Sequence, residues 1–265
     1  MSVHNKHDAA VRALEADANN VYDWFSRNAI SVNIDKTQLV VFHSPLKRVD
    51  LTCSFILHGF NCRNCSCTPL QYVSTIKYLG ILFDADMTWK SHLSYVCKRL
   101  RALSCVLYSF RYLAPTRVRR SMLDALGYSV LRYGITLFAH CSESWKVKVN
   151  AVLKSCLKSI AYRNFSMGSS GNLFRDLCFP YFYNLFKYCT VVKHLWSPTF
   201  KVPVQCSRPH RKSTFNLYVP FSRTNYGFHR RICYVPRVFN ELPVEFAAFN
   251  SIGQVKRRLR SMYNW

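Results

Sequence analysis

Residues 70–83 read LQYVSTIKYLGILF and residues 91–110 read SHLSYVCKRLRALSCVLYSF, and the spacing of apolar residues changes between the two segments. The first segment is rich in β-branched and aromatic residues and predicts a strand, in which Gly80 suggests a bulge or a close approach of the backbone. The second repeats its apolar residues at helical spacing. The repeating residues are Leu93, Val96, Leu100, Leu103, Leu107 and Phe110. We therefore expect a β-containing part to give way to a helical part near residue 90.

Upstream of this change, the sequence predicts one helix and two further strands. Residues 8–28 form an amphipathic helical pattern, with Val11, Leu14, Ala18, Val21, Trp24 and Phe25 on one face. Residues 39–42, LVVF, predict a buried strand, and a second strand is expected around 51–57. The polar residues 61–67 would form the hairpin loop before the strand at 70–83. Residues 1–90 are thus expected to hold a helix and a small antiparallel sheet, in an α+β fold.

Downstream of residue 90, the pattern is mainly helical. Residues 117–140 and 144–162 predict two helices, and Thr116 is the expected N-cap of the first. These helices complete a helical region over 91–165, and the glycine- and serine-rich residues 167–171 predict a linker. A mixed, basic and aromatic region over 166–265 follows. Within it we expect a helix in 172–198, weak strand character in 200–235, and a short helix over 251–263 with Ile252, Val255 and Leu259 facing inward.

Charge is the strongest signal of function. Lys and Arg number 37 and Asp and Glu number 13, which gives a formal net charge of +24. Such a charge attracts polyanions, nucleic acid first among them, and contacts to phosphates position a protein without reading sequence. The candidate phosphate-binding residues of the helical region are Lys98, Arg99, Arg101, Arg117, Arg119 and Arg120. For each one taken singly, a solvated helix face is the alternative.

The sequence gives no sign of a membrane protein. No apolar run approaches the roughly 18–20 residues needed to cross a bilayer, and the first residues lack the apolar core of a signal peptide. We therefore expect an intracellular protein of the nucleus and cytoplasm that has no membrane partner.

Several motifs occur in an order that points to one enzyme family. A helix with Trp24 precedes Asn33-x-x-Lys36-Thr37, and Lys77-Tyr78-Leu79-Gly80 follows at a hairpin. Further members of the series are Asp84, Trp89, His92, Tyr133-Gly134 and Phe239-Asn240-Glu241-Leu242-Pro243. The series resembles the region after the catalytic loop in the reverse transcriptase, an RNA-directed DNA polymerase, of non-LTR, jockey-like retrotransposons. The resemblance covers nearly the whole chain.

This resemblance implies a truncated right-hand polymerase palm over 1–90, a helical thumb over 91–165 and a basic C-terminal region. The parent enzyme would use magnesium and deoxynucleotides, with an RNA template and a DNA primer as partners. Lys36 would match the lysine that protonates the leaving pyrophosphate. Lys77, Tyr78 and Gly80 would match the primer grip. The alternative from the residues alone is that Lys36 is an exposed lysine at the start of a strand. For Lys77 to Gly80, the alternative is an ordinary core strand.

One departure from the family limits the expected activity. The family's metal-binding carboxylates lie on a Tyr-Ala-Asp-Asp-type turn expected before residue 8, and this sequence has no two adjacent acids. Two-metal nucleotidyl transfer requires clustered carboxylates. We therefore expect a polymerase fragment that binds template–primer nucleic acid but does not polymerise. It is expected to hold no cofactor and to have the upstream polymerase part as a further partner. The alternative is a non-enzymatic RNA-binding ribonucleoprotein component derived from such an element.

Two other groups of residues are candidates for metal binding. Asp84-x-Asp86 would share one face of a strand, although a solvated strand end is the simpler interpretation. Cys62-x-x-Cys65-x-Cys67, with Cys53 and His58 nearby, resembles half of a zinc site. A second ligand pair at fixed spacing is missing, so a cysteine-bearing loop is the alternative.

Overall fold

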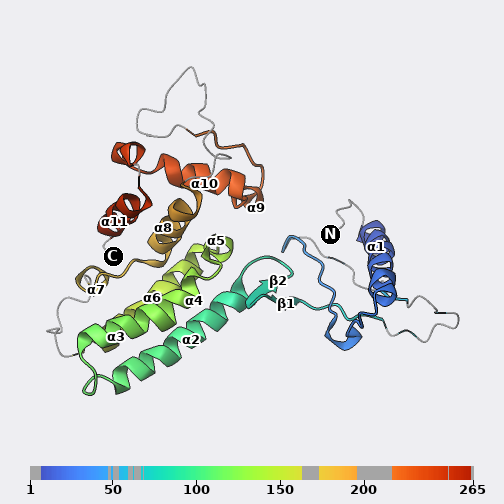
Figure 1. Ribbon diagram of the computed structural model, residues 1–265, viewed down its shortest axis with the longest axis horizontal. Coiled ribbons are helices and arrows are strands. Elements are labelled where there is room, and N and C mark those ends of the chain that lie inside the picture. Colours follow the sequence, from blue (N-terminus) through green and yellow to red (C-terminus); the bar gives the residue numbers. More distant parts are fainter. Residues whose placement is uncertain are drawn as a thin grey trace. The chain divides into compact units, whose positions relative to one another are not determined.

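Two structural units make up the chain in the computed structural model, residues 1–92 and residues 93–265 (Figure 1). The structure describes residues 7–46, 49, 54–58, 62, 67, 69–162, 173–195, 217–249 and 251–263. Over these residues the fold is α+β, mostly helical with one two-stranded antiparallel sheet. The predicted linker at 167–171 lies outside the described residues.

In the first unit, helix α1 (His7–Arg27) confirms the predicted N-terminal helix but buries only part of its apolar stripe. Its N-terminal half contributes to a small core of Val11, Leu39, Phe55 and Leu70. At the other end of the stripe, Trp24 is 56% exposed. A short 3-10 helix, η1 (Ile34–Lys36), follows.

The strands predicted at 39–42 and 51–57 do not form in the described residues. Leu39 is buried but makes only an isolated bridge to Tyr72, and Ile56 makes only an isolated bridge to Pro69. Phe42 is exposed. A β-branched run becomes a strand only where a neighbouring strand supplies cross-strand partners, and these segments meet their neighbours at single points.

The single strand predicted over 70–83 is a hairpin instead. Strands β1 (Thr75–Tyr78) and β2 (Ile81–Asp84) pair antiparallel, and Tyr78 lies opposite Ile81. Leu79 and Gly80 form the turn between them, with φ values of 46° and 81°. Positive φ at both central residues is the requirement of a type I′ turn. Gly80 therefore serves a tight turn and not a bulge.

Contacts after the hairpin fix the start of helix α2 (Lys90–Ser109). The buried carboxylate of Asp84 accepts a hydrogen bond from the backbone N–H of Ser91 at 3.2 Å, where the helix dipole favours negative charge. The ring of Phe83 lies 5.3 Å from that of Trp89. Asp86 accepts hydrogen bonds from the backbone N–H and the hydroxyl of Thr88 at 3.1 and 2.7 Å. Both acids of the Asp84-x-Asp86 pair thus hold the main chain in place.

The second unit begins with α2, whose predicted apolar stripe is buried from Leu93 to Leu107. Phe110 lies beyond the end of the helix and is exposed. The next elements are α3 (Thr116–Met122), the π-helix η2 (Leu123–Tyr128), α4 (Ser129–Arg132), α5 (Ile135–Phe138), α6 (Glu143–Ala161), α7 (Leu173–Asp176) and α8 (Phe182–His194). Helix α6 confirms the helix predicted over 144–162.

The helix predicted over 117–140 is interrupted near its end. The chain runs through α3, η2 and α4 to Arg132, and Gly134 then adopts φ 72° before α5 begins. This left-handed conformation is one that glycine adopts without steric cost. The N-cap of α3 is Pro115, so the expected capping role of Thr116 is wrong.

Helix α8 lies between the earlier helices and the C-terminal ones (Figure 1). It packs against α4, α5 and α6, and also against α10 (Arg231–Asn240) and α11 (Ile252–Met262). Its buried residues include Phe182, Leu185, Phe186 and Val191. The regions expected as a separate thumb and C-terminal region therefore share one packed unit.

The C-terminal segment is more helical than predicted. Helix α9 (Asn225–Phe228) and the start of α10 replace the weak strand character expected up to residue 235. In the described part of that prediction, from 217 onward, Leu217 has the geometry of a β-bridge, but residues 225–228 and 231–235 are helical and the prediction is wrong there. After η4 (Val244–Ala248), helix α11 confirms the predicted last helix. Val255 and Leu259 are buried as expected, whereas Ile252 is exposed.

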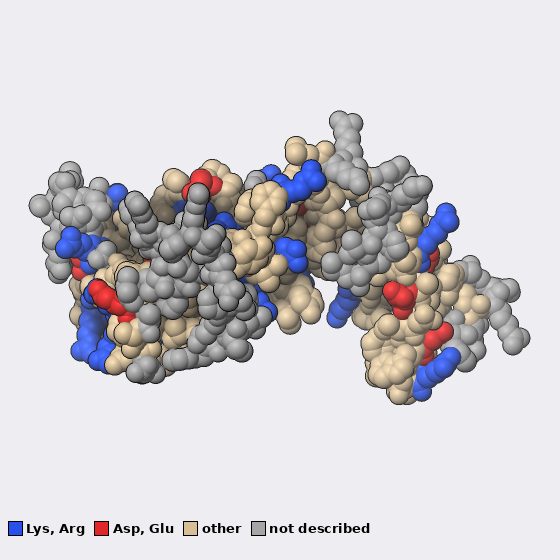
Figure 2. Space-filling view, turned by 90° about the horizontal axis from the view of Figure 1, so that it is seen from above, with Lys and Arg blue, Asp and Glu red and all other residues tan. Residues whose placement is uncertain are grey.

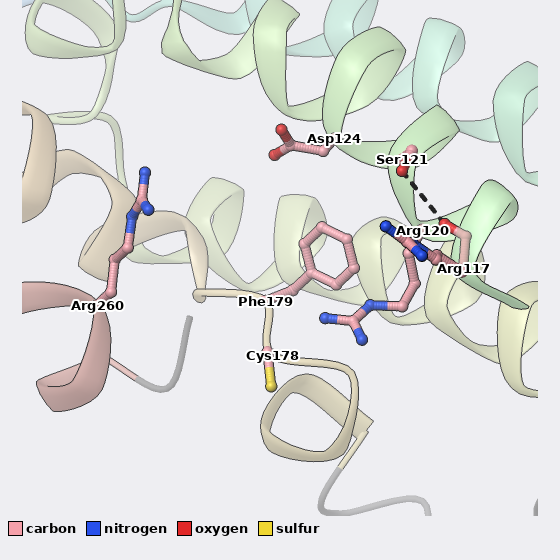
Figure 3. A pocket seen from close by; sticks show the side chains of 7 residues that line it. All are labelled: Arg117, Arg120, Ser121, Asp124, Cys178, Phe179 and Arg260. Carbon is pink, nitrogen blue, oxygen red and sulfur yellow. Dashed lines mark hydrogen bonds between the residues drawn. The ribbon is translucent and has the colours of Figure 1, made fainter. Parts of the chain in front are cut away.

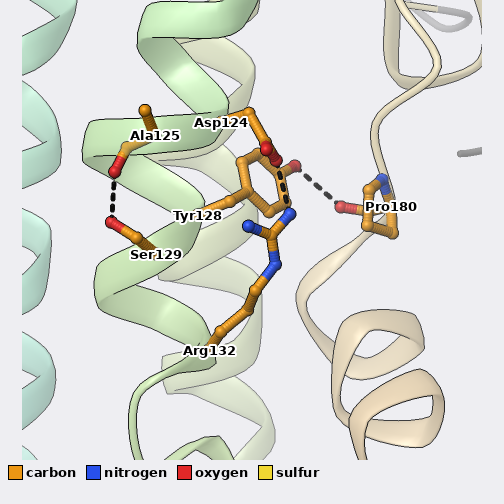
Figure 4. Close-up of polar contacts among 6 residues, drawn as sticks. All are labelled: Asp124, Ala125, Tyr128, Ser129, Arg132 and Pro180. Carbon is orange, nitrogen blue, oxygen red and sulfur yellow. Dashed lines mark hydrogen bonds and ion pairs between the residues drawn. The ribbon is translucent and has the colours of Figure 1, made fainter. Parts of the chain in front are cut away.

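A buried tyrosine fastens η2 to the segment before α8 (Figure 4). The hydroxyl of Tyr128 donates a hydrogen bond to the carbonyl oxygen of Pro180 at 2.8 Å, and its ring stacks on Phe179 at 4.9 Å. Asp124 of η2 and Arg132 of α4 form an ion pair, and the Arg132 guanidinium carbon lies 5.9 Å from the centroid of the Tyr128 ring. These contacts fix the position of residues 179–180, of which Phe179 lines the pocket described below.

Candidate nucleic-acid interface

Basic side chains from two distant parts of the sequence meet at one pocket of the second unit. Arg117 and Arg120 of α3 and Arg260 of α11 line a pocket of about 480 Å³. Its other lining residues are Ser121, Asp124, Cys178 and Phe179. Figure 3 shows Arg260 on one side, Arg117 and Arg120 on the other, and the ring of Phe179 between them. Guanidinium groups match the geometry of phosphate oxygens, so the pocket fits an anion of that class.

The pocket is built on fixed groups. Phe179 is held by its stacking on Tyr128 and by the adjacent bond from Tyr128 to Pro180. The acidic lining residue, Asp124, already pairs with Arg132, which lies outside the pocket lining. The charge of Asp124 is therefore offset by that ion pair and does not offset the pocket arginines in full.

Three predicted basic residues lie exposed on α2, off its buried stripe: Lys98, Arg99 and Arg101. Arg99 lies over the ring of Tyr95, 5.9 Å from its centroid. Burial raises the pKa of the Cys97 thiol, and the positive charges of Arg101 and of Lys148 in α6 oppose that rise. The charges of Arg101 in α2 and of Lys148 in α6 thus both act on this buried thiol.

Arg119 does not belong to this surface. It is 4% exposed, and its guanidinium donates hydrogen bonds to the carbonyl oxygen of Ser159 at 2.9 Å and to the hydroxyl of Thr116 at 3.4 Å. The predicted phosphate contact is thus not supported, because the side chain ties α3 to α6. The sequence alone does not separate Arg119 from Arg120, because Leu123 lies four residues after the first and three after the second, and both spacings place residues on one helical face.

Sequence reasoning missed an exposed aromatic cluster around Arg111. The guanidinium carbon lies 4.0, 4.4 and 5.4 Å from the ring centroids of Tyr108, Tyr112 and Tyr162. These rings are 41%, 55% and 48% exposed. The spacing of Tyr108, Arg111 and Tyr112 along the chain is visible in the sequence. The contribution of Tyr162, from the end of α6, depends on the fold. Exposed aromatic rings beside an arginine are stacking partners for nucleic-acid bases.

In the first unit, Lys77, Tyr78 and Gly80 lie exposed at the tip of the β1–β2 hairpin. Tyr78 is 62% exposed, so the alternative of a buried core tyrosine is wrong. Lys36 is also exposed. The residues of its motif hydrogen-bond to one another. The Asn33 side chain accepts a hydrogen bond from the Lys36 backbone N–H at 3.0 Å, and the Thr37 hydroxyl donates one to the Asn33 carbonyl oxygen at 2.8 Å.

Among the described residues, one group of side chains has the composition of a metal site: His58, Cys62 and Cys67. Asp84 and Asp86 are not part of such a group. Asp84 instead accepts hydrogen bonds from Ser91 and Thr75, and Asp86 from Thr88.

The surface as a whole carries more basic than acidic groups. In Figure 2, Lys and Arg side chains form several separate patches, and acidic side chains are few. Over the part of the chain that the structure describes, no helix combines the length and the apolar character that a bilayer span requires. In comparisons with known proteins, the chain matches no family model, no curated protein and no solved structure.

Proposed function

We propose that the second unit binds nucleic acid through its sugar–phosphate backbone, without reading base sequence. The observation that carries this proposal is the pocket lined by Arg117, Arg120 and Arg260, in which the acidic lining residue Asp124 pairs with Arg132. A phosphate group supplies the oxygens that such guanidinium groups bind best. The net charge of +24 adds a long-range attraction that raises the rate of encounter with a polyanion.

The parts of the surface have different tasks in this proposal. The arginine pocket holds one phosphate firmly, and Lys98, Arg99 and Arg101 follow the backbone along α2. The tyrosines around Arg111 stack on an exposed base or sugar. In the first unit, the hairpin tip with Lys77, Tyr78 and Gly80 contacts the backbone of a second segment, and Lys36 makes a further phosphate contact.

At the level of the whole protein, we propose a fragment of a polymerase of the reverse transcriptase type. The support is the order of the motifs from Trp24 to Pro243 in the sequence. Residues 1–90 would be the palm remnant and residues 91–165 the thumb, with an RNA template and a DNA primer as ligands. Magnesium and nucleotide would be handled by carboxylates of the upstream polymerase part, because Asp84 and Asp86 are engaged with the main chain of this one.

A second candidate is a non-enzymatic RNA-binding component of a ribonucleoprotein. The observation that favours it is the cluster of three exposed tyrosines around Arg111. Sequence-tolerant stacking on aromatic rings is the usual way in which proteins hold unpaired bases. This candidate predicts tighter binding to single-stranded RNA than to an RNA–DNA duplex, and the polymerase fragment predicts the reverse.

Fluorescence anisotropy with a labelled RNA–DNA duplex tests the pocket. Affinity should fall with salt at a log–log slope of about −0.9 for each phosphate neutralised. Replacing Arg117, Arg120 and Arg260 together by alanine should weaken binding by roughly a hundredfold, because a net loss of about 0.9 kcal/mol for each of three hydrogen-bonded contacts sums to about 2.7 kcal/mol. The slope should become shallower by about 0.9 per lost contact.

The matched control is Arg257→Ala, on the same helix as Arg260 but outside the pocket lining. It removes one positive charge and should change affinity far less than Arg260→Ala. Equal losses from the two variants would mean that only net charge matters and that the pocket has no special role. A primer-extension assay with magnesium should yield no product, and extension by this chain would contradict the proposed division of labour.

A further inference from the structure

The loop between Phe55 and Leu70 brings together three side chains that the nucleic-acid proposal does not use. His58, Cys62 and Cys67 each offer one ligand atom, and these atoms all lie within 4.8 Å of one another. The two sulfur atoms are 3.6 Å apart. This separation is longer than the length of about 2.05 Å of a disulfide bond, and both cysteines are free thiols.

The spacing matches that of ligands around a tetrahedral zinc ion. Zn–S and Zn–N distances of about 2.3 and 2.0 Å place neighbouring ligand atoms about 3.5–3.8 Å apart. The separation of the Cys62 and Cys67 sulfurs falls in this range. The imidazole of His58 reaches the same range by a shift of about 1 Å, which a rotation of its side chain supplies.

The base of the loop is closed by contacts that hold the three residues near one another. The Leu70 backbone N–H donates to the Phe55 carbonyl at 2.8 Å, and Ile56 forms a bridge with Pro69. The backbone N–H of His58 donates to the side chain of Asn19 in α1 at 2.8 Å. Anchored ends lower the entropy lost when a loop closes around an ion.

We propose that His58, Cys62 and Cys67 bind one zinc ion, which fastens this loop beside α1. Thiolate and imidazole ligands select zinc over the oxygen-binding ions magnesium and calcium. The fourth tetrahedral position is left to a solvent molecule or another donor. The first unit has a small apolar core, and a structural zinc ion adds folding free energy where such a core is limited. This inference does not depend on nucleic-acid binding.

Cobalt substitution tests the site directly. The full chain, reduced and stripped of metal by a chelator, is titrated with Co²⁺ alone and then with Zn²⁺. One equivalent of Co²⁺ should produce a thiolate-to-cobalt charge-transfer band and the visible bands of tetrahedral cobalt, and one equivalent of Zn²⁺ should abolish both. Zinc should also raise the thermal unfolding temperature of the chain.

Variants locate the ion. The double variant Cys62→Ser/Cys67→Ser should weaken cobalt binding by at least about tenfold, since even changes outside the ligand set cost 10–100-fold in affinity. His58→Gln should weaken binding and keep the charge-transfer band at high cobalt. The control is Cys105→Ser, an exposed cysteine of α2, which should behave as the native chain does.

Two results would overturn the proposal. One is a native chain that gives no charge-transfer band at stoichiometric cobalt, a measurement that needs no variant to fold. The other is a band of unchanged strength and affinity in the double variant, which would place the ion on other cysteines.

Discussion

Tyr128 is fully buried, and its hydroxyl group donates to the carbonyl oxygen of Pro180 at 2.8 Å. Tyr128→Phe keeps the ring and its stacking on Phe179 but leaves that carbonyl without this donor. We expect the free energy of unfolding to fall by about 1–2 kcal/mol. Urea denaturation measures the change. The control is Tyr218→Phe on an exposed ring, and an equal effect in both variants would show that the buried bond contributes nothing.

Gly127, next to Tyr128 in η2, is required by the closeness of α2. A Cβ atom there would lie 2.9 Å from Leu123 Cδ1, 3.1 Å from Leu103 Cδ2 and 3.2 Å from Leu100 Cδ2. These leucines are themselves buried and have little room to move. Gly127→Val should therefore lower the free energy of unfolding by about 1–3 kcal/mol through overpacking.

Ala125→Val provides the comparison for Gly127→Val, because Ala125 lies on the exposed face of the same π-helix. It tests the cost of a β-branched residue by itself, which is below about 1 kcal/mol. If both variants lose the same stability in urea denaturation, the close approach to α2 is not what requires glycine.

In the β1–β2 hairpin, Leu79 occupies a turn position that suits other residues better. Its φ of 46° is left-handed, a conformation that costs a residue with a branched side chain about 1 kcal/mol or more. Leu79→Asn creates the Asn-Gly pair that type I′ turns favour. Amide hydrogen exchange in β1 and β2 should slow by roughly fivefold for each 1 kcal/mol gained.

Leu79→Ala is the control for this hairpin, because alanine shortens the side chain and keeps the conformational cost. Exchange as slow in Leu79→Ala as in Leu79→Asn would mean that the leucine side chain, and not its backbone conformation, limits the hairpin.

The hairpin also shows which elements the sequence could predict. Helices α2, α6 and α11 follow from the spacing of their apolar residues, because one stripe per helix meets the core. Leu79-Gly80 lacks the usual turn composition, so the sequence pattern predicted one continuous strand over 70–83 where the structure has two strands and a turn. The run at 39–42 has strand composition, but strand formation depends on partners that only the fold supplies.

The candidate interface also combines residues that the sequence could predict with residues whose place depends on the fold. Arg117 and Arg120 could be predicted from charge, whereas the burial of Arg119 depends on its contact with Ser159 of α6, which only the fold supplies. Arg260 joins their pocket from the far end of the sequence. That contact requires α11 to pack against α8, and no local pattern contains it.

Across the whole chain, the excess of basic residues sets how stability responds to solution conditions. A net charge of +24 makes the folded state repel itself, and protonation of histidines below neutral pH adds to the repulsion. His140 adds a second effect, because its ring stacks on His229 at 4.7 Å and lies 4.9 Å from Phe186 and 4.8 Å from Tyr234. It thereby joins the end of α5 to α8 and α10.

Burial, together with the nearby charges of His229, Arg237 and Lys146, lowers the pKa of His140 from 6.5 to about 3. The unfolded chain therefore binds a proton near pH 6.5 that the folded chain refuses. This difference in proton binding has no effect above pH 6.5, and it lowers the free energy of unfolding progressively as the pH falls from 6.5 toward 3. Thermal unfolding from pH 8 to pH 4 should show this loss, and His140→Phe, which keeps the ring packing, should make the decline shallower.

His43→Gln, a histidine change in the other unit, should leave the slope of the native chain in place. Since simple charge repulsion acts equally in all three proteins, an unchanged slope in His140→Phe would assign the acid sensitivity to net charge alone and would remove the buried histidine from the explanation.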